Sequence, residues 1–166
     1  MSSAVTEIDP SSGNKTEKYK SRRRIAREFA LQGIYQWQVA GGAASFIEQQ
    51  LRESEEFKHV DGKHFVHVLH GVLQHAEELE KIILPHLDRA LNELSPVESA
   101  ILLLGTFELI HHPEIPYRAI INEAIELART YGGSDGYKYV NGVLDKLAIQ
   151  LRPVEATMPK TVKHRP

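Results

Sequence analysis

The sequence predicts an all-α fold, a helical bundle of about seven helices, on three observations. Apolar residues recur at steps of three and four along most of the chain, no segment alternates with the period of two that a β-strand requires, and the links between periodic segments are short. With 166 residues and 42% hydrophobic side chains, the chain can bury a core. We expect one domain over residues 21–151, a flexible basic extension over 1–20 and a disordered basic tail over 152–166.

The first helix is expected over residues 21–39, and Gly41-Gly42 is a typical end for it. Its apolar face consists of Ile25, Ala26, Phe29, Ala30, Gly33, Ile34 and Trp37. At about 100° per residue, Arg24, Arg27, Leu31 and Tyr35 fall on the opposite side of the helix. We therefore predict a solvent-facing stripe that carries arginine and an aromatic ring.

Six further helical segments are expected over 43–57, 62–83, 85–94, from Ser95, over 117–131 and from Ser134. The fourth has a strong start signal in Ser95-Pro96-Val97-Glu98, with serine as N-cap and proline at the first helical position. Residues 97–110 are apolar nearly all round the helix, which is typical of a central helix surrounded by others.

Positive charge is concentrated at the start of the first helix. Residues 15–27 hold seven Lys and Arg and one acid, whereas residues 28–151 hold nine against eighteen Asp and Glu, so the formal net charge of -2 hides a polarised molecule. Such a cluster binds polyphosphates by releasing condensed counterions, and arginine adds planar forks for phosphate. We expect nucleic acid as its partner, contacted by Arg24 and Arg27 from the helix and by Arg22 and Arg23 from a frayed first turn.

The glycine-rich segment 132–142 is a second candidate contact. A glycine turn that feeds a helix start exposes backbone N–H groups to a phosphate, and Lys138 and Tyr139 add a charge and a stacking ring. The alternative is a plain turn between helices, with Asp135 as cap and the tyrosines packed. Both interpretations stay open, although Tyr139 lies off the apolar stripe.

The sequence offers little for catalysis, cofactors or metals. It has no cysteine, no phosphate loop and no nucleophile elbow, so we expect no enzyme and no cofactor. Glu123 and Glu126 are expected to pair with Arg118 or Arg129 or simply to be solvated. No metal site is expected, and His64, His67 and His70 are interpreted as a solvated polar face. Without a long apolar run or a secretion signal, the chain should be cytoplasmic, with no membrane partner.

Three ordered blocks of this sequence resemble the NusB family of transcription antitermination proteins. The blocks are RRRIAREFALQGIYQW over 22–37, IPYRAIINEAIELA over 115–128 and KYVNGVLDKL over 138–147. With the helix from Ser95, the resemblance covers residues 21–151.

The resemblance implies two perpendicular three-helix sub-bundles and a bacterial factor without catalytic activity. Such a factor binds boxA RNA, a short, largely single-stranded element of nascent transcripts, above all of ribosomal RNA operons. It does so with NusE, a ribosomal small-subunit protein, in a complex that lets RNA polymerase pass terminators. The family's RNA-binding positions fall on Arg22, Arg23, Arg24, Arg27, Gln32, Tyr35, Asp135, Lys138 and Tyr139, and the NusE-facing positions on Glu93 and Glu98.

Two other classes of protein share part of this pattern. The related domain of ribosomal RNA cytosine methyltransferases accompanies a methyl-donor domain and a cysteine nucleophile, both absent here. The other is a protein-only helical adaptor or homodimer whose arginines engage acidic protein surfaces. Displacement by single-stranded boxA RNA would separate this alternative from an RNA-binding protein.

Overall fold

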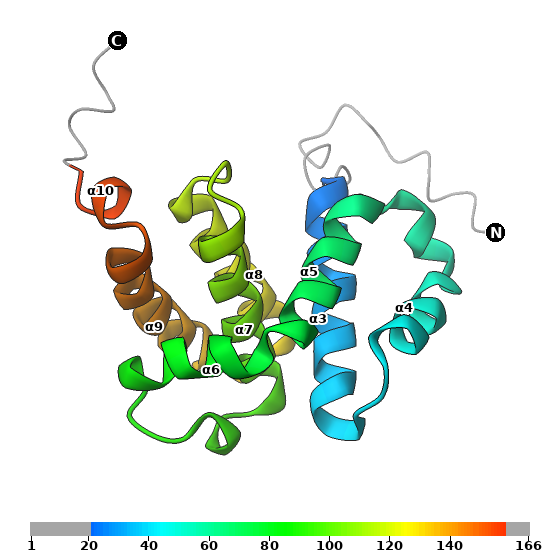
Figure 1. The fold of residues 1–166 in the computed structure, drawn as a ribbon, viewed down its shortest axis with the longest axis horizontal. Helices are drawn as coiled ribbons and strands as arrows, with labels where there is room; N and C mark the ends of the chain where they lie inside the picture. Colours follow the sequence, from blue (N-terminus) through cyan, green and yellow to red (C-terminus); the bar gives the residue numbers. More distant parts are fainter. Residues whose placement is uncertain (1–20, 159–166) are drawn as a thin grey trace, which may run out of the picture.

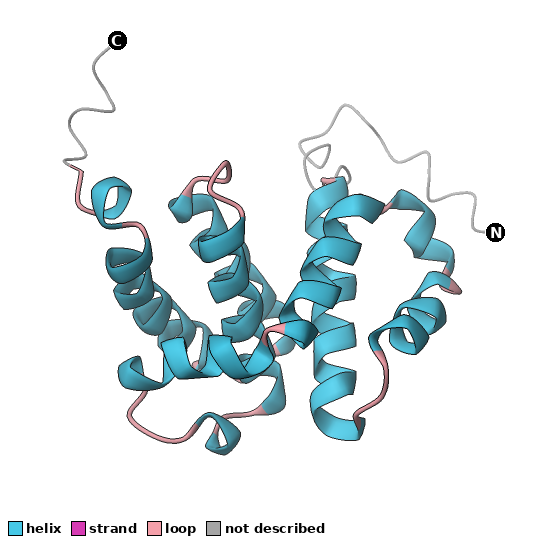
Figure 2. Ribbon diagram, viewed as in Figure 1, coloured by secondary structure: helices cyan, strands magenta, loops and turns pink. Residues whose placement is uncertain are grey.

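The computed structural model describes residues 21–158, which form eight α-helices, three short 3-10 helices and no β-strand (Figure 2). The predicted all-α class is confirmed. The α-helices are α3 (Arg22–Ala40), α4 (Ala44–Arg52), α5 (Gly62–Gln74), α6 (Ala76–Ile83), α7 (Pro96–His111), α8 (Tyr117–Tyr131), α9 (Gly136–Leu151) and α10 (Pro153–Ala156). The 3-10 helices are η1 (Glu55–His59), η2 (Leu84–His86) and η3 (Leu91–Glu93). The predicted extension, 1–20, and residues 159–166 of the predicted tail lie outside the described residues.

The helices form two groups that meet along α3 and α7 (Figure 1). One group contains α3, α4 and α5, the other contains α7, α8 and α9, and α6 runs across one end of the second group. Helix α3 packs against both α5 and α7, and α7 also packs against α8 and α9. Every residue of α7 from Ser99 to Leu109 is buried, which confirms the predicted central helix.

The predicted long helix over 62–83 is wrong, because the chain breaks at His75. Its backbone, with φ -107° and ψ 19°, leaves the helical region, and α6 starts in a new direction that buries Leu79 and Ile83. Neither glycine nor proline marks the break, so apolar spacing alone merged α5 with α6. The predicted helix over 85–94 is also absent, since extended backbone at Leu87 and Ala90 leaves only η2 and η3.

The predicted disordered tail does not begin at residue 152. The Arg152 guanidinium donates hydrogen bonds to the carbonyl oxygens of Leu109, His112 and Ile115, each at 2.9 Å. Helix α10 follows directly. These bonds hold Arg152 against the connection between α7 and α8, and the Tyr117 N–H donates to Glu155 of α10 at 2.9 Å, contacts that the composition of the segment did not signal.

Gly71 allows α5 to approach α7 closely, and Gly71→Ala should destabilise the fold. A Cβ built at Gly71 overlaps the buried ring of Phe107. Because overpacking of a core costs about 1–3 kcal/mol, the midpoint of urea unfolding should fall. Gly142→Ala is the matched control: its Cβ meets nothing within 4 Å, and alanine stabilises a helix interior by about 0.5–1 kcal/mol over glycine. Equal midpoints for the two variants would contradict the packing role of Gly71.

Candidate nucleic-acid interface

The first turn of α3, residues 21–24, is named the arginine turn here. Ser21 caps the helix, with its Oγ accepting a hydrogen bond from the Arg24 backbone N–H at 2.9 Å. The Asp61 N–H donates to the Arg22 carbonyl at 3.1 Å, and Arg22 Nη2 donates to the Val60 carbonyl at 3.2 Å. The prediction that Arg22 and Arg23 act from a frayed turn is therefore wrong, because the capping serine and residues 60–61 fix the turn.

Each arginine of the turn combines an exposed surface with a contact inside the protein. Arg22 is exposed, and the Arg23 side chain is 42% exposed with its Nε 3.6 Å from Asp61. The Arg24 side chain is 39% exposed and donates to both Glu123 carboxylate oxygens, from Nε at 2.9 Å and from Nη2 at 2.8 Å. That hydrogen bonding raises the pKa of Arg24 above its usual value. The turn thus holds three fixed charges at the surface.

Arg27 does not belong to a solvent-facing stripe, so the predicted stripe is wrong at this position and at Leu31. The Arg27 side chain is 6% exposed, and its Nε lies 2.9 and 3.0 Å from the two carboxylate oxygens of Glu108 in α7. Leu31 is also buried. The physical reason is that α3 has packing partners on two sides, α5 and α7, so its buried face is wider than its apolar periodicity indicates.

Glu108 is the centre of a buried charged cluster, which we call the Glu108 cluster, formed with Arg27 and His64. Glu108 is fully buried, and its Oε2 lies 2.6 Å from His64 Nε2. Burial alone would raise the pKa of Glu108, but the His64 hydrogen bond and the Arg27 charge outweigh it, and the pKa is lowered. Since an ionised carboxylate can only accept, His64 Nε2 carries the proton. The prediction of a solvated His64 is wrong.

Gln32 and Tyr35 are exposed further along α3. Gln32 lines a cavity of about 460 Å³ together with Gln50 of α4 and Tyr131 of α8. Tyr131 and Arg24 also line a smaller cavity, of about 210 Å³, between α3 and α8. The structure thus brings the end of α8 beside the first half of α3.

Asp135, Lys138 and Tyr139 lie in a second cluster, at the start of α9. Lys138 Nζ is 3.7 Å from Asp135 Oδ1, and the Tyr139 hydroxyl donates to Asp88 Oδ1 at 3.0 Å. The guanidinium of Arg89 lies 5.2 Å from the centre of the Tyr139 ring. Hydrogen bonds from Arg89 and Tyr139 lower the pKa of Asp88 to about 2. Sequence reasoning missed Asp88 and Arg89, because a loop carries no periodicity that points to α9.

The glycine turn before α9 already has an anion beside it. The Glu98 carboxylate lies against Gly132 and Gly133, and a Cβ at Gly136 would overlap it. Glycine at 136 therefore leaves room for a carboxylate at a helix start, where the backbone N–H groups favour negative charge. Glu98 faces its own chain, whereas Glu93 is exposed and accepts a hydrogen bond from the Ala90 N–H at 3.4 Å.

Other predicted pairings also differ. Glu123 pairs with Arg24 instead of Arg118 or Arg129; Arg118 lies 3.6 Å from Asp145, and Arg129 lies over the Tyr137 ring. Of the three histidines predicted on a solvated face, only His64 is buried; His67 is exposed and contacts His112, and His70 is partly exposed and contacts Glu48. Within residues 21–158, no group of three or more His, Cys, Asp or Glu could hold a metal ion. None of the helices in that range is long and apolar enough to span a membrane.

The model of the NusB family matches residues 24–149 of the chain. The chain belongs to the NusB family. NusB is a transcription antitermination factor and its family is non-enzymatic, so this chain is no enzyme, as expected. Among its relatives are proteins named transcription antitermination protein NusB from Nitrosospira multiformis, 68% identical over 78% of this chain and 82% of the relative, and from Nitrosomonas eutropha, 62% identical over 88% and 86%.

Two solved structures share the fold. NusB from T. maritima aligns with 30% identity and a TM-score of 0.70, over 82% of this chain and 96% of that one. A complex of the antitermination factors NusB and NusE with double-stranded RNA aligns with 24% identity and a TM-score of 0.67, over 76% and 95%. The second likeness concerns the fold alone.

Replacing Glu108 by glutamine should destabilise the protein strongly. Removing one partner of a buried ion pair leaves the other charge uncompensated, which costs about 3–5 kcal/mol. Because the pKa of Glu108 is lowered on folding, its stabilisation is present above the pH at which unfolded glutamate titrates, about 4.3, and is lost as the pH falls through the folded pKa. Urea unfolding of Glu108→Gln should show the loss at pH 7 and a weaker decline of stability in acid.

The exposed Glu126 on α8 provides the control. Glu126→Gln removes the same charge at a surface position, where substitutions stay within about 0.5 kcal/mol. A Glu108→Gln variant as stable as Glu126→Gln at pH 7 would show that the Glu108 cluster does not hold α3, α5 and α7 together.

Proposed function

We propose that this NusB-family protein acts in antitermination by binding boxA RNA of nascent transcripts, chiefly of ribosomal RNA operons, together with NusE. The assembly joins the RNA polymerase antitermination complex in the cytoplasm, where transcripts are made. The chain contributes binding surfaces, and no chemical step is assigned to it.

The arginine turn is the observation that carries this proposal. Three consecutive arginines are held on a capped helix end, and their guanidinium groups remain partly exposed beside an otherwise acidic body. Cations fixed in this way take up backbone phosphates without first being ordered, which lowers the entropic cost of binding.

The other predicted contacts extend the surface from the arginine turn. Gln32 and Tyr35 follow it along α3, and Asp135, Lys138 and Tyr139 begin α9. We assign phosphate contacts to the arginines and Lys138, and stacking of unpaired bases to the two tyrosines. Arg27 is assigned no RNA contact, because its buried guanidinium donates hydrogen bonds to the Glu108 carboxylate. It supports the surface by fixing α3 against α7.

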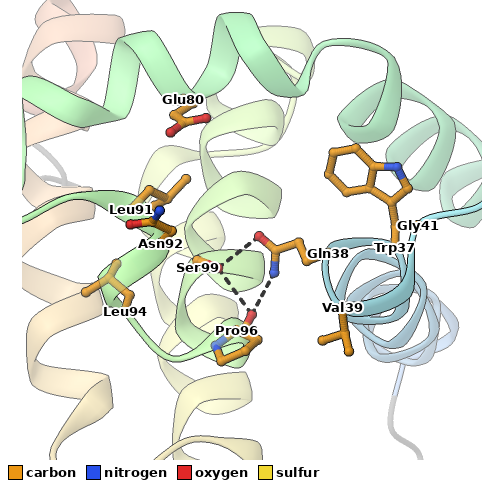
Figure 3. Close-up of a pocket in the computed structure, with 10 residues that line it drawn as sticks. All are labelled: Trp37, Gln38, Val39, Gly41, Glu80, Leu91, Asn92, Leu94, Pro96 and Ser99. Carbon is orange, nitrogen blue, oxygen red and sulfur yellow. Dashed lines mark hydrogen bonds between the residues drawn. The ribbon is translucent and has the colours of Figure 1, made fainter.

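The NusE-facing surface is assigned to the end of the molecule that holds Glu93. There η3, α6 and the last turn of α3 enclose a cavity of about 530 Å³. Figure 3 shows the Trp37 ring and the Glu80 carboxylate at its rim, with Gln38 fixed by hydrogen bonds to Ser99 and Pro96. An apolar hollow with polar groups at its edge suits a protein partner. Glu98, which faces the glycine turn, acts here only by shaping that turn.

Neutralising Arg22 and Arg23 should weaken binding of boxA RNA and reduce its dependence on salt. Each phosphate contact to a single strand contributes about 0.7 to the slope of log K against log salt, so Arg22→Gln with Arg23→Gln should flatten the slope by about 1.4. Labelled boxA RNA titrated at several salt concentrations, with and without NusE, measures both quantities. The matched control is Lys81→Gln with Lys146→Gln, two exposed lysines outside the proposed surface.

An unchanged slope in the arginine variant would contradict the proposal. If the chain binds neither boxA RNA nor a scrambled RNA, even with NusE present, the result would instead favour the protein-only adaptor or homodimer. Sedimentation of the chain alone and with NusE would then identify the oligomer.

A further inference from the structure

We propose that Glu123 is a specificity-determining latch: it holds the Arg24 guanidinium in the free protein and releases it only to a correctly placed RNA phosphate. This inference rests on the proposed function and extends it to a residue outside the predicted RNA-binding set.

The geometry makes any RNA contact by Arg24 an exchange of partners. Arg24 uses Nε and Nη2 to donate to the two oxygens of Glu123, at 2.9 and 2.8 Å. These parallel donors are the pair that guanidinium groups offer to phosphate as well as to carboxylate. On this edge of the guanidinium, a phosphate and Glu123 therefore exclude each other.

The exchange is possible because Glu123 has a second cation within reach. Arg27 Nη1 lies 3.9 Å from Glu123 Oε1, and Glu108 fixes Arg27 in place. When Arg24 leaves, Glu123 keeps a positive neighbour. The Arg24 and Glu123 side chains are 39% and 21% exposed, so a phosphate can approach the pair from solvent.

The other arginines of the turn are not held in this way. Arg23 makes a looser contact with Asp61, at 3.6 Å, and Arg22 donates to a backbone carbonyl that carries no net charge. Any polyanion can approach these two guanidinium groups. At Arg24 the charges of Glu126 and Glu28 add to that of Glu123, so a phosphate must be positioned well before it displaces the carboxylate.

The latch has a distinctive effect on salt dependence. When Arg24 contacts RNA it releases a cation condensed on the strand. Arg27 is already paired with Glu108 and compensates the freed Glu123 only in part, so Glu123 attracts a cation from solution and the net contribution of Arg24 to the salt slope is small. Without the carboxylate, Arg24 would contribute the full value of about 0.7 for a single strand. Removing Glu123 should therefore increase both the affinity and the slope.

The test compares Glu123→Gln with the wild-type chain in titrations of boxA RNA and of a scrambled strand of equal length, with NusE present. A partly exposed ion pair is worth about 0.2–1 kcal/mol, so Glu123→Gln should bind boxA about 1.4- to 5-fold more tightly, with a slope steeper by about 0.7. The scrambled strand should gain more than boxA, so that discrimination between them falls. Glu77→Gln on α6 makes the same change of net charge at an exposed position that is not among the acids acting on Arg24, and its slope should stay at the wild-type value.

A double-mutant cycle distinguishes the latch from a general change of charge. In an Arg24→Gln background, Glu123→Gln should leave RNA affinity unchanged, and a gain that persists there overturns the proposal. The proposal is also overturned if the wild-type chain binds boxA RNA and Glu123→Gln, at equal thermal stability, binds it no more tightly. The proposed function stands in that case. Failure of the wild-type chain to bind boxA with NusE refutes the proposed function itself.

One measurement needs no variant. In the wild-type protein, the Arg24 Nε–H signal in a nitrogen-15 NMR spectrum should be protected from solvent exchange and should shift when boxA RNA saturates the site. A signal that stays unchanged at saturation means that Arg24 remains with Glu123, and the latch is then wrong.

Discussion

The buried ion pair between Arg27 and Glu108 is the constraint on which the rest of the structure depends. A carboxylate with no exposed surface in the central helix is tolerated only with a cation and a hydrogen-bond donor against it. Arg27 supplies the first from α3 and His64 the second from α5. Such a pair adds little net stability over a hydrophobic contact, but any other register of the three helices would leave charges buried and unpaired. It thereby specifies how α3 sits between α5 and α7.

Fixing Arg27 also fixes the direction of the arginines one turn earlier. A helix repeats every 3.6 residues, so with Arg27 directed at α7, Arg24 comes next to α8 and Arg23 next to the start of α5. The arginines of residues 22–27 therefore have two different roles. Its last arginine holds the helix from inside, and the first three offer charge at the surface. A substitution at Arg27 would impair RNA binding through the fold, and its effect could be mistaken for loss of a direct contact.

The sequence allowed the helices with strong caps or uniform periodicity to be located, namely α3, α7, α8 and α9. It failed where tertiary contacts decide the outcome. The break at His75 has no proline or glycine, and Arg152 is held by carbonyl groups of a distant loop. At the site, the composition of the sequence predicted the cluster of arginines at the start of α3. It did not predict that this first turn is capped instead of frayed. Glu108 carried a signal in the sequence, because it is the single acid of residues 99–111, which are otherwise almost entirely apolar, and an acid in such a stretch indicates a buried cation opposite it, here Arg27.

Clustered like charges raise the free energy of a folded chain through mutual repulsion, so a preorganised cationic surface needs acids nearby. Asp61 and Glu123 meet this need for Arg23 and Arg24. The same acids compete with phosphate, so the protein balances order in the free state against affinity for RNA. The balance differs along the turn, since a single contact of 3.6 Å yields more readily than two hydrogen bonds below 3 Å. Association can therefore begin at Arg22 and Arg23 and be completed at Arg24, where a misplaced strand gains nothing.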